Sequence, residues 1–563
     1  MRTALVFGAT GFIGRWLVRE LASQGAQVVA AVRTSGAELQ EWPSGVKLVK
    51  VDFAASDLGL DEAALAGVTE IHNLAGAYRF GMSKQEAYDG NVVTARRIVE
   101  LAARLPLRPR LVHVSGYRVG SHDSLPDDAY RRLGAYEASK IEADGVVKQT
   151  AAELAVPFTI VNPSTVSGHS ATGESEQQLG LAASLRELWN GELVALPRNA
   201  FVPVVTVDHL ARFMALVATL DEADGQSYWV LDDNTPPLRE LLQLVARHYD
   251  VPVPRLAVPV SVIQRLPRKL TQVDPETISF LDNSRYPTAA ADSLAERHGL
   301  AQPETVPALL RWADHLAAHR FGAVRPGHQT RQFLNVAGTR TFSIGDPEAD
   351  TVVLPPLPLN ADTWATPGMQ VVDLPGTGMS SGDESTWLTW LTALLQDRPD
   401  VHLIGHSVGA ALAVEYAATH KVGRLTLVAP AFLQPRPGLL NRSALVTALW
   451  FRHAGAAAMA RRLLGNESSD LTLAAQDLRR PGVARRAGRL IRRGADPARR
   501  TTLKRALSNY PGDVHVIVGE HDPLVPDSLP GNVRVTVIDG AGHYPQLTHP
   551  TQLHEALQAV RLG

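Results

Sequence analysis

Short runs of apolar, often β-branched residues alternate with longer stretches of helical spacing over about the first 250 residues. Between the runs, residues 13–25 and 94–105 carry apolar side chains at the spacing of an amphipathic helix. The runs are almost continuously hydrophobic, so they predict parallel strands buried on both faces of a doubly wound α/β sheet. They lie at residues 3–8, 26–33, 46–52, 70–76, 110–116 and 158–164.

The strand rhythm weakens between about 233 and 318, where helical spacing predicts a smaller substrate region. Glycine, proline and charged residues without a sustained period then indicate a linker at 323–332, between domains at 1–322 and 333–563. Strand-like runs restart after it and predict a second α/β sheet with its own core. They lie at residues 340–346, 351–356, 369–376, 401–407, 424–430, 514–520 and 533–539.

Residues 434–510 interrupt this second series of strands with helical patterns, which predicts a helical cap over the sheet. Within residues 451–510 there are 14 Lys and Arg against 4 Asp and Glu. Such a basic cap could bind an anionic substrate such as an acyl-CoA, or an acidic membrane surface. The alternative is a solvated arginine-rich face with no partner.

Composition narrows the class of protein. The formal net charge of −2 gives no reason to expect nucleic acid, and the absence of cysteine removes disulfides and thiolate chemistry. The histidines are scattered without metal-ligand spacing, so no metal site is expected. The sequence begins without a signal-peptide pattern, and no apolar run reaches the roughly 18 residues of a membrane span. We therefore expect a soluble cytoplasmic protein; whether it forms a homo-oligomer stays open.

A glycine-rich turn follows the first predicted strand. Gly8, Gly11 and Gly14 would let the chain turn tightly, approach a pyrophosphate and pack helix against strand. The N-terminus of the following helix adds N–H groups and a positive dipole. The turn therefore predicts dinucleotide binding, with Thr10, Phe12 and Ile13 beside the cofactor.

Residues at the ends of later strands refine the expected cofactor. Arg33 ends the second strand, where an acidic residue usually holds the ribose hydroxyls of NAD, and an arginine can instead pair with a 2′-phosphate. NADP(H) is therefore favoured over NAD(H). Asp52 could lie beside the adenine, and the stretch Leu74, Ala75 and Gly76 could line the cofactor.

A serine, a tyrosine and a lysine supply candidate chemistry in the same half. Tyr136 and Lys140 are four residues apart and share one helix face. A nearby ammonium would lower the pKa of the tyrosine, so that it could exchange a proton during hydride transfer. Ser115 follows a predicted strand and could hydrogen-bond the substrate oxygen.

These motifs resemble the extended, epimerase-like branch of the short-chain dehydrogenase/reductase family over residues 1 to about 320. The resemblance implies that Ser115, Tyr136 and Lys140 are catalytic, that Asn91 is a structural asparagine and that Pro163 contacts the cofactor. It does not select a reaction, because the family includes epimerases, dehydratases and carbonyl reductases. The apolar stretch at 251–266 hints at a hydrophobic substrate, although the same residues could be core.

The second half carries a Gly-x-Ser-x-Gly pentapeptide between a predicted strand and a small-residue helix. A nucleophile on such a turn takes a strained backbone conformation, so Gly405 and Gly409 must be small. The turn would raise Ser407 above the sheet and aim the Val408 N–H into an oxyanion hole. Asp522 and His543 follow on strand-end loops in the chain order that a hydrolase triad needs.

Residues 333–563 thus resemble the α/β-hydrolase family, including its turn at 373–382. The stretch after the first long strand departs from the family, because Pro355, Pro356 and Pro358 have no N–H. The second oxyanion donor is therefore expected to be the Leu357 backbone. A serine nucleophile argues against the aspartate-dependent dehalogenases and epoxide hydrolases of this fold.

The two halves together predict a bifunctional enzyme. One half would be an NADP(H)-dependent carbonyl or alcohol oxidoreductase, and the other a serine hydrolase of esters, thioesters or lactones, with small hydrophobic carbonyl and acyl substrates. One alternative keeps a single active half, with the other as a cofactor-bound scaffold or inert partner domain. A second alternative is an NADP(H)-sensing binding protein.

Overall fold

The computed structural model describes residues 2–33, 41–77, 79, 81–119, 128–193, 195–259, 262, 283–325, 327, 329–364, 367–435, 443–465, 470–522 and 533–559. The chain divides into two compact units. The first unit comprises Met1–Leu185, Leu193–Val245 and Val253–Leu316. The second comprises Arg186–Glu192, Ala246–Pro252 and Ala317–Gly563. The division after Leu316 therefore falls before the stretch that the sequence marks as a linker.

A seven-stranded parallel sheet forms the centre of the first unit, in the order β10-β6-β5-β4-β1-β2-β3. The chain leaves β1 in one direction to β2 and β3, and later returns to the other side of β1 with β4. This reversal creates a switch point between β1 and β4, where sheets of this type bind ligands. The strands are β1 (Thr3–Phe7), β2 (Gln27–Val32), β3 (Lys47–Lys50), β4 (Glu70–Asn73), β5 (Arg110–Val114), β6 (Phe158–Pro163) and β10 (Gln226–Val230).

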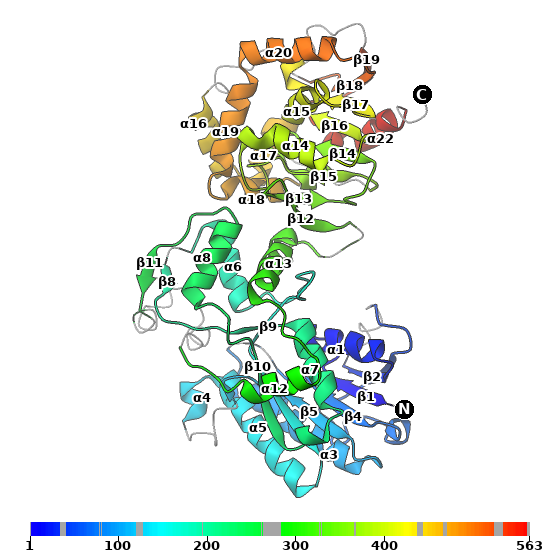
Figure 1. Ribbon diagram of the computed structural model, residues 1–563, viewed down its shortest axis with the longest axis vertical. Helices are drawn as coiled ribbons and strands as arrows, with labels where there is room; N and C mark the ends of the chain where they lie inside the picture. The colour runs from blue at the N-terminus through cyan, green and yellow to red at the C-terminus, as the bar shows by residue number, and fades with distance from the viewer. Residues whose placement is uncertain are drawn as a thin grey trace. The chain divides into compact units, whose positions relative to one another are not determined.

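Helices cover both faces of this sheet (Figure 1). Alternate side chains of β1 enter two separate cores: Ala4 and Val6 pack with helices α1 and α7, and Leu5 and Phe7 pack with α3 and α5. This burial on both sides explains why the strands read as continuous hydrophobic runs. The four helices are α1 (Phe12–Ser23), α3 (Thr94–Arg104), α5 (Ala135–Glu153) and α7 (Val207–Val217).

Shorter elements complete the first unit and the region beyond residue 180. The predicted substrate region at 233–318 contains three of the helices and one short strand, but residues 260, 261 and 263–282, with part of the apolar stretch at 251–266, lie outside the described residues. The helices are α2 (Lys84–Ala87), η3 (Tyr88–Val93), α4 (Ala129–Arg132), α6 (Leu181–Asn190), α8 (Leu238–His248), α12 (Ala289–Arg297) and α13 (Thr305–Ala318). The strands are β7 (Thr165–Ser167), β8 (Ala195–Pro197), β9 (Val204–Thr206) and β11 (Leu256–Val258).

An eight-stranded sheet forms the centre of the second unit, in the order β12-β13-β15-β14-β16-β17-β18-β19. Strand β13 is antiparallel to both of its neighbours, and the remaining pairs are parallel. Residues 331 and 332, which the sequence assigned to the linker, instead begin β12. The strands are β12 (Arg331–Val336), β13 (Thr339–Ile344), β14 (Thr351–Leu354), β15 (Gln370–Val372), β16 (His402–His406), β17 (Arg424–Val428), β18 (Val514–Gly519) and β19 (Val533–Ile538).

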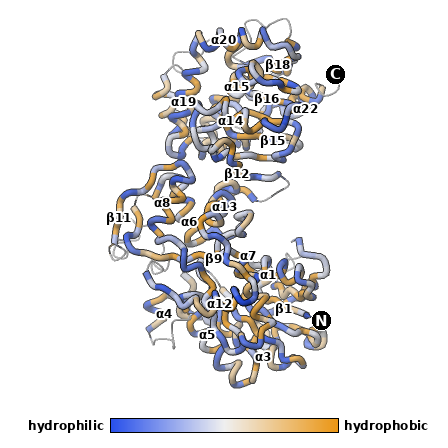
Figure 2. The backbone as a smooth tube through the Cα atoms, in the orientation of Figure 1, coloured by the Kyte–Doolittle hydropathy of each residue, from blue (hydrophilic) through white to orange (hydrophobic). Residues whose placement is uncertain are grey.

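Five cap helices lie between β17 and β18 in the described parts of this segment, where the sequence predicts a helical cap. They share one hydrophobic core with the sheet, since Met459, Leu478 and Leu490 of the cap belong to the same buried cluster as Leu354 and Leu403. The apolar residues of β16 and α15 are coloured orange in Figure 2. The cap helices are α16 (Ala444–His453), α17 (Ala456–Leu464), α18 (Thr472–Arg479), α19 (Val483–Gly494) and α20 (Pro497–Ser508); the others are α14 (Trp387–Leu394), α15 (Val408–Ala417), α21 (Pro545–Thr548) and α22 (Pro550–Gln558).

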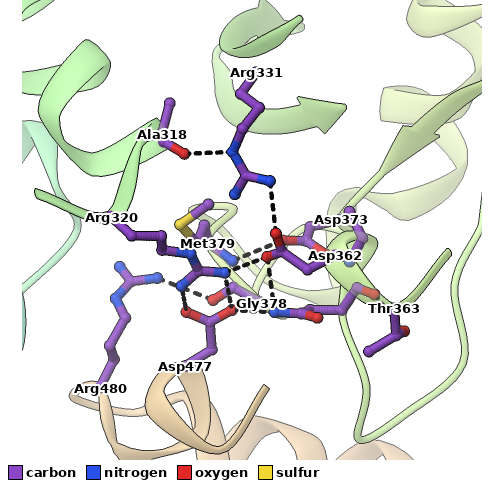
Figure 3. A network of polar contacts seen from close by, with 12 residues as sticks. Ala318, Arg320, Arg331, Asp362, Thr363, Asp373, Gly378, Met379, Asp477 and Arg480 are labelled. Atoms are coloured by element: carbon purple, nitrogen blue, oxygen red, sulfur yellow. Dashed lines mark hydrogen bonds and ion pairs between the residues drawn. The ribbon is translucent and has the colours of Figure 1, made fainter. Parts of the chain in front are cut away.

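A buried ion-pair network ties the cap to the sheet within the second unit (Figure 3). The Arg320 guanidinium donates to the carboxylate of Asp477 in α18 and to Asp362 Oδ2 at 2.5 Å. Arg331 of β12 donates to the other oxygen of Asp362 at 2.6 Å. Burial alone would lower the pKa of Arg320, but the two carboxylates outweigh burial and raise that pKa above its ordinary value. Arg320 therefore keeps its charge in the interior.

A second buried carboxylate lies beside this network. Asp373 accepts hydrogen bonds from the backbone N–H groups of Ala361 and Met379, each at 2.8 Å. Burial, reinforced by the charge of Asp477, raises the pKa of Asp373 to about 7. Asp373 therefore fixes the turn after β15 through its acceptor oxygens.

No described helix is both long and apolar enough to cross a bilayer. Within the same residues, no group of three or more histidine, aspartate or glutamate side chains is arranged to hold a metal ion.

Candidate active sites

A cavity of about 470 Å³ opens at the carboxyl ends of the strands in the first unit. It lies at the switch point of the sheet and collects most of the residues that the sequence assigned to cofactor binding and catalysis. The predicted residues that line it are Gly8, Gly11, Phe12, Ile13, Gly14, Leu74, Gly76, Asn91, Ser115, Tyr136, Lys140 and Pro163.

The glycine turn has the geometry that its spacing predicts. Gly8 has a φ of +78°, and the Gly11 N–H donates to Gly8 O at 3.0 Å. A Cβ atom on Gly14 would lie 2.2 Å from Gly8 O, closer than side-chain atoms tolerate. The turn therefore requires glycine, and it leads into the N-terminus of α1, whose first residues line the cavity. A phosphate group fits such a helix N-terminus.

Four residues assigned to cofactor binding are not among the described residues that line this cavity: Thr10, Arg33, Asp52 and Ala75. Arg33 is exposed at the end of β2, directly before residues 34–40, which lie outside the described range. The Asp52 carboxylate accepts a hydrogen bond from the Ala54 N–H at 2.9 Å. The assignment of Arg33 to a 2′-phosphate thus stays a prediction.

Tyr136 and Lys140 share one face of α5 and line the cavity together. The Lys140 ammonium donates to Val114 O at 3.0 Å, which anchors it to the end of β5. Burial lowers the pKa of Lys140 to about 8, although the Asp144 carboxylate opposes the shift. The lysine is thus held near the point where it loses its proton at mildly alkaline pH.

Asn91 connects two walls of this cavity. Its Oδ1 accepts from the Ala77 N–H at 2.8 Å, and its Nδ2 donates to Ser139 Oγ at 2.9 Å. Ser139 lies between Tyr136 and Lys140 on α5, and Asn91 is 3% exposed. The asparagine thus fixes the helix that carries the tyrosine relative to the loop after β4.

Buried hydroxyl groups in the cavity fit a polar ligand. Ser115 Oγ and Ser164 Oγ are buried, and no described residue gives either atom a hydrogen-bond partner. Buried polar groups are nearly always hydrogen-bonded in folded proteins. Together with the glycine turn and the helix N-terminus, these atoms suit a nicotinamide dinucleotide and a small polar substrate group.

Two charged residues of the same cavity were not singled out from the sequence. Arg118 and Glu137 line the wall beside Ser115 and Tyr136, and Arg118 Nε donates to Glu137 Oε1 at 3.0 Å. Their side chains are 16% and 4% exposed. Glu137 directly follows Tyr136 and Arg118 lies three residues after Ser115, but their pairing joins a loop to a helix and has no local sequence signature.

In the second unit, Ser407 occupies a sharp turn between β16 and α15. Its φ of 56° and ψ of −106° are strained for a residue with a side chain. A Cβ atom on Gly405 would lie 2.6 Å from Ala410 Cα, and one on Gly409 would lie 2.3 Å from Leu354 O. Both flanking glycines are therefore required, as the pentapeptide predicts.

Ser407, His543 and Asp522 form a continuous hydrogen-bonded series. His543 Nε2 lies 3.0 Å from Ser407 Oγ, and His543 Nδ1 lies 3.1 and 3.2 Å from the two oxygens of Asp522. The exposed fractions are 5% for the serine, 9% for the histidine and 1% for the aspartate. The carboxylate therefore fixes the Nδ1–H tautomer of His543 and leaves Nε2 to accept the proton of Ser407.

Further buried side chains support this series and were missed by sequence reasoning. Gln434 Nε2 donates to Asp522 Oδ2 at 3.0 Å. Trp364 Nε1 donates to His406 Nδ1 at 3.1 Å, so His406 donates through Nε2 to His543 O at 2.8 Å. Burial, reinforced by the neighbouring His543, holds the pKa of His406 far below its ordinary value, which keeps that ring neutral.

A cavity of about 660 Å³ lies above Ser407. Its floor includes Val408 and Leu357, the two residues expected to supply oxyanion donors. The Leu357 carbonyl accepts from Tyr544 Oη at 3.2 Å, which fixes this segment. Helices α16, α17 and α19 of the cap provide the remaining wall, where apolar residues such as Trp450 and Phe451 predominate.

The arginines of the cap have two different roles in the fold. Arg480 and Arg500 are buried and donate to the backbone oxygens of Gly378 and Phe432, at 2.9 and 3.3 Å. Exposed arginines line one face of α19: Arg485, Arg489, Arg492 and Arg493. The basic composition of the cap is therefore only partly a surface property.

These features define a chain with a dinucleotide-binding reductase-type unit and an α/β-hydrolase-type unit. Residues 4–230 match the family model described as the NAD dependent epimerase/dehydratase family, and residues 345–556 match that of the Alpha/beta hydrolase family. The first half therefore carries a domain that matches the NAD dependent epimerase/dehydratase family, and the second half a domain that matches the Alpha/beta hydrolase family.

Curated relatives match the first half. Carbonyl reductase [NADPH] 2 of Sus scrofa is 31% identical over 199 residues, covering 33% of this chain and 79% of that protein. Sterol demethylase protein B of Methylococcus capsulatus is 29% identical over 275 residues, which cover 46% of this chain and 79% of that protein. With a relative from Synechocystis sp., 32% identical over 174 residues, the chain spans only 49% of the relative's length. The solved terminal R domain from the myxalamid PKS-NRPS biosynthetic pathway is 19% identical, with a TM-score of 0.48, covering 58% of this chain and 93% of that one.

Proposed function

We propose that this chain is a bifunctional enzyme, with an NADP(H)-dependent carbonyl or alcohol oxidoreductase in its first half and a serine hydrolase in its second. The observation that supports the proposal is that, in each unit, the residues expected from the sequence to be catalytic lie together at one cavity. Ser115, Tyr136 and Lys140 line one cavity, and the Ser407–His543–Asp522 series lies beneath the other.

In the hydrolase half, Ser407 attacks the carbonyl carbon of an ester, thioester or lactone while His543 Nε2 takes its proton. Asp522 stabilises the imidazolium that forms. The N–H groups of Val408 and Leu357 stabilise the oxyanion, and such a donor contributes about 10²–10³ in rate. His543 then returns the proton to the leaving group, and water releases the acyl group by the same path in reverse.

In the reductase half, the bound nicotinamide supplies or accepts hydride. Ser115 Oγ and Tyr136 Oη hold the substrate oxygen, and Tyr136 donates the proton that a carbonyl needs to become an alcohol. Lys140, anchored on Val114 O, stabilises the tyrosinate that remains. Asn91 positions the helix that carries both residues.

A preference for NADP(H) over NAD(H) is the finer part of the proposal. Arg33 at the end of β2 supports it, because a guanidinium can pair with a 2′-phosphate. The name of the Sus scrofa relative, which specifies NADPH, points the same way. Comparing the dissociation constants of NADPH and NADH for wild type and Arg33→Ala tests it: the variant should lose affinity for NADPH only.

The hydrolase cavity supports an acyl substrate with a hydrophobic chain, because apolar cap residues cover Ser407. The exposed arginine face of α19 supports an acyl-CoA or an acidic surface as a partner. Joining the two activities in one chain supports substrates from one acyl or carbonyl pathway. Unrelated substrates for the two halves would contradict that link.

Hydrolysis of p-nitrophenyl esters of increasing acyl length tests the hydrolase half. Wild type should hydrolyse at least one of these esters. The Ser407→Ala variant should lose about 10⁴-fold or more of kcat, whereas Tyr136→Phe should keep the kcat of wild type. NADPH-dependent reduction of a ketone panel should show the opposite dependence. If only one of the two activities is found, the other half is a scaffold or partner domain; if neither is found but NADPH binds, the sensing alternative holds.

A further inference from the structure

The Arg118–Glu137 ion pair occupies the wall of the reductase cavity beside the reacting groups. Arg118 follows Ser115 by three residues in the loop after β5, and Glu137 directly follows Tyr136 on α5. All four residues line the same cavity. Anything held at the serine and the tyrosine therefore lies close to this pair.

One oxygen of the glutamate is left over. Arg118 Nε donates to Oε1, whereas Oε2 is buried and receives no hydrogen bond from any residue in the described ranges. The Glu137 side chain is only 4% exposed, so bulk water does not readily satisfy it. A buried acceptor on a charged group is among the least favourable atoms to leave unpaired.

The charge of the pair limits what can complete it. Arg118 already balances the carboxylate, so a second cation is not required, and a substrate anion would be repelled by Glu137. The fitting group is neutral and carries a hydrogen-bond donor. A hydroxyl of a carbonyl compound is such a group, and its carbonyl oxygen would lie at Ser115 and Tyr136, which line the same cavity as Glu137.

We infer that Glu137 Oε2 accepts a hydrogen bond from a substrate hydroxyl near the reacting carbonyl, so that the reductase half acts on hydroxylated ketones or aldehydes. The inference rests on the proposed oxidoreductase function and names its substrate class. The expected substrate is then a carbonyl compound that carries a hydroxyl group, rather than one whose remaining part is entirely hydrocarbon. Glu137 selects the substrate, and Arg118 positions Glu137.

Discrimination follows from desolvation. A ketone without the hydroxyl displaces water from Oε2 and donates no hydrogen bond to that atom. Sites built to bond a substrate hydroxyl reject analogues lacking it by up to about 10⁴-fold. Because the carboxylate is charged, its hydrogen bond is stronger than the one that a neutral amide accepts.

The test uses the full chain and ketones of equal length, with and without a hydroxyl on the first or second carbon from the carbonyl. Wild type should show a kcat/KM at least about tenfold higher for one hydroxylated ketone than for its parent. Glu137→Gln should reduce that ratio about tenfold or more, mainly through KM for the hydroxylated ketone. Glu153→Gln, at an exposed position on the same helix, is the matched control and should leave the ratio unchanged.

Two further measurements separate the outcomes. The Kd of NADPH should be the same for wild type and Glu137→Gln; a large change would assign Oε2 to the cofactor and overturn the inference. If Glu137→Gln fails to fold, Arg118→Met with Glu137→Met removes both charges and should also lose the hydroxyl preference. Reduction of all ketones without hydroxyl preference overturns the inference alone. No reduction of any ketone overturns the proposed oxidoreductase function as well.

Discussion

Replacing Arg320 by methionine is expected to destabilise the second unit strongly. The Arg320 side chain is 4% exposed and lies between the carboxylates of Asp477 and Asp362, which are 2% and 9% exposed. Methionine fills much of the same volume but removes the charge. Two buried carboxylates would then lose their shared cation, although Asn360 would still donate to both of them and Arg331 to Asp362.

The magnitude follows from the cost of an unpaired buried charge. Breaking a buried ion pair by removing one partner destabilises proteins by about 3–5 kcal/mol. For a domain of 150–250 residues, each kcal/mol lowers Tm by about 2–4 °C, so the transition should fall by roughly 6–20 °C. Arg493→Met is the matched control, because that arginine lies 3.9 Å from Glu384 and is 55% exposed. Loss of such a surface pair should change stability by no more than about 1 kcal/mol.

Differential scanning calorimetry of the full chain, with and without NADPH, measures the effect. The cofactor should raise only the transition of the first unit, so the transition that it leaves in place identifies the second unit. Arg320→Met should lower that second transition and leave the other unchanged. A decrease no larger than that of Arg493→Met would refute the idea that the network is a major source of stability.

Three further predictions concern the two sites. Gln434→Leu removes a donor that holds the Asp522 carboxylate in place, so the hydrolase kcat should fall by about tenfold, and an unchanged kcat would contradict this. Lys140 has a folded pKa of about 8 against an ordinary 10.5, so the unfolded chain binds more protons between these values and stability should rise with pH across that window. Urea midpoints at pH 7.5 and pH 9.5 should show this rise for the first unit of wild type, and Lys140→Met should lose it. Gly14→Ala places a Cβ 2.2 Å from Gly8 O and should abolish NADPH binding by calorimetry, and retained affinity would show that the turn can adjust.

Much of this architecture could be predicted because its signals are local. The glycine turn and the Gly-x-Ser-x-Gly pentapeptide each stand between a hydrophobic strand and a helix, so spacing alone fixes their geometry. The aspartate and histidine of the second half could be placed because each follows a strand, and parallel strands end at one edge of a sheet. The series through Ser407, His543 and Asp522 has the predicted order and contacts.

Two strands of the main sheets, β10 and β12, were not predicted from the sequence, and neither were the short strands β7, β8, β9 and β11. The β10 segment, Gln226–Val230, pairs with a single neighbour at the edge of the sheet, and only Tyr228 and Val230 in it are buried. Strand β12 is also an edge strand, and only its antiparallel pairing with β13 distinguishes it from the polar segment before it. Edge strands bury fewer side chains and therefore carry a weaker hydrophobic signal.

The supporting side chains could not be predicted because their partners are distant in sequence. Gln434 meets Asp522 across 88 positions, and Arg320 meets Asp477 across 157. Glutamine and arginine are usually exposed, so composition gives no reason to bury them. Only the folded arrangement makes these residues necessary.

The backbone at Ser407 has a consequence for how the second half has been maintained. A non-glycine residue held at a φ of 56° and ψ of −106° carries about 1–3 kcal/mol of strain. Glycine would release much of it and would fit the turn as well. Selection for folding alone would therefore favour losing the serine, and an inert partner domain would drift toward glycine there. A serine at this strained position, hydrogen-bonded to a buried histidine, therefore favours the proposed hydrolase chemistry over an inert partner domain.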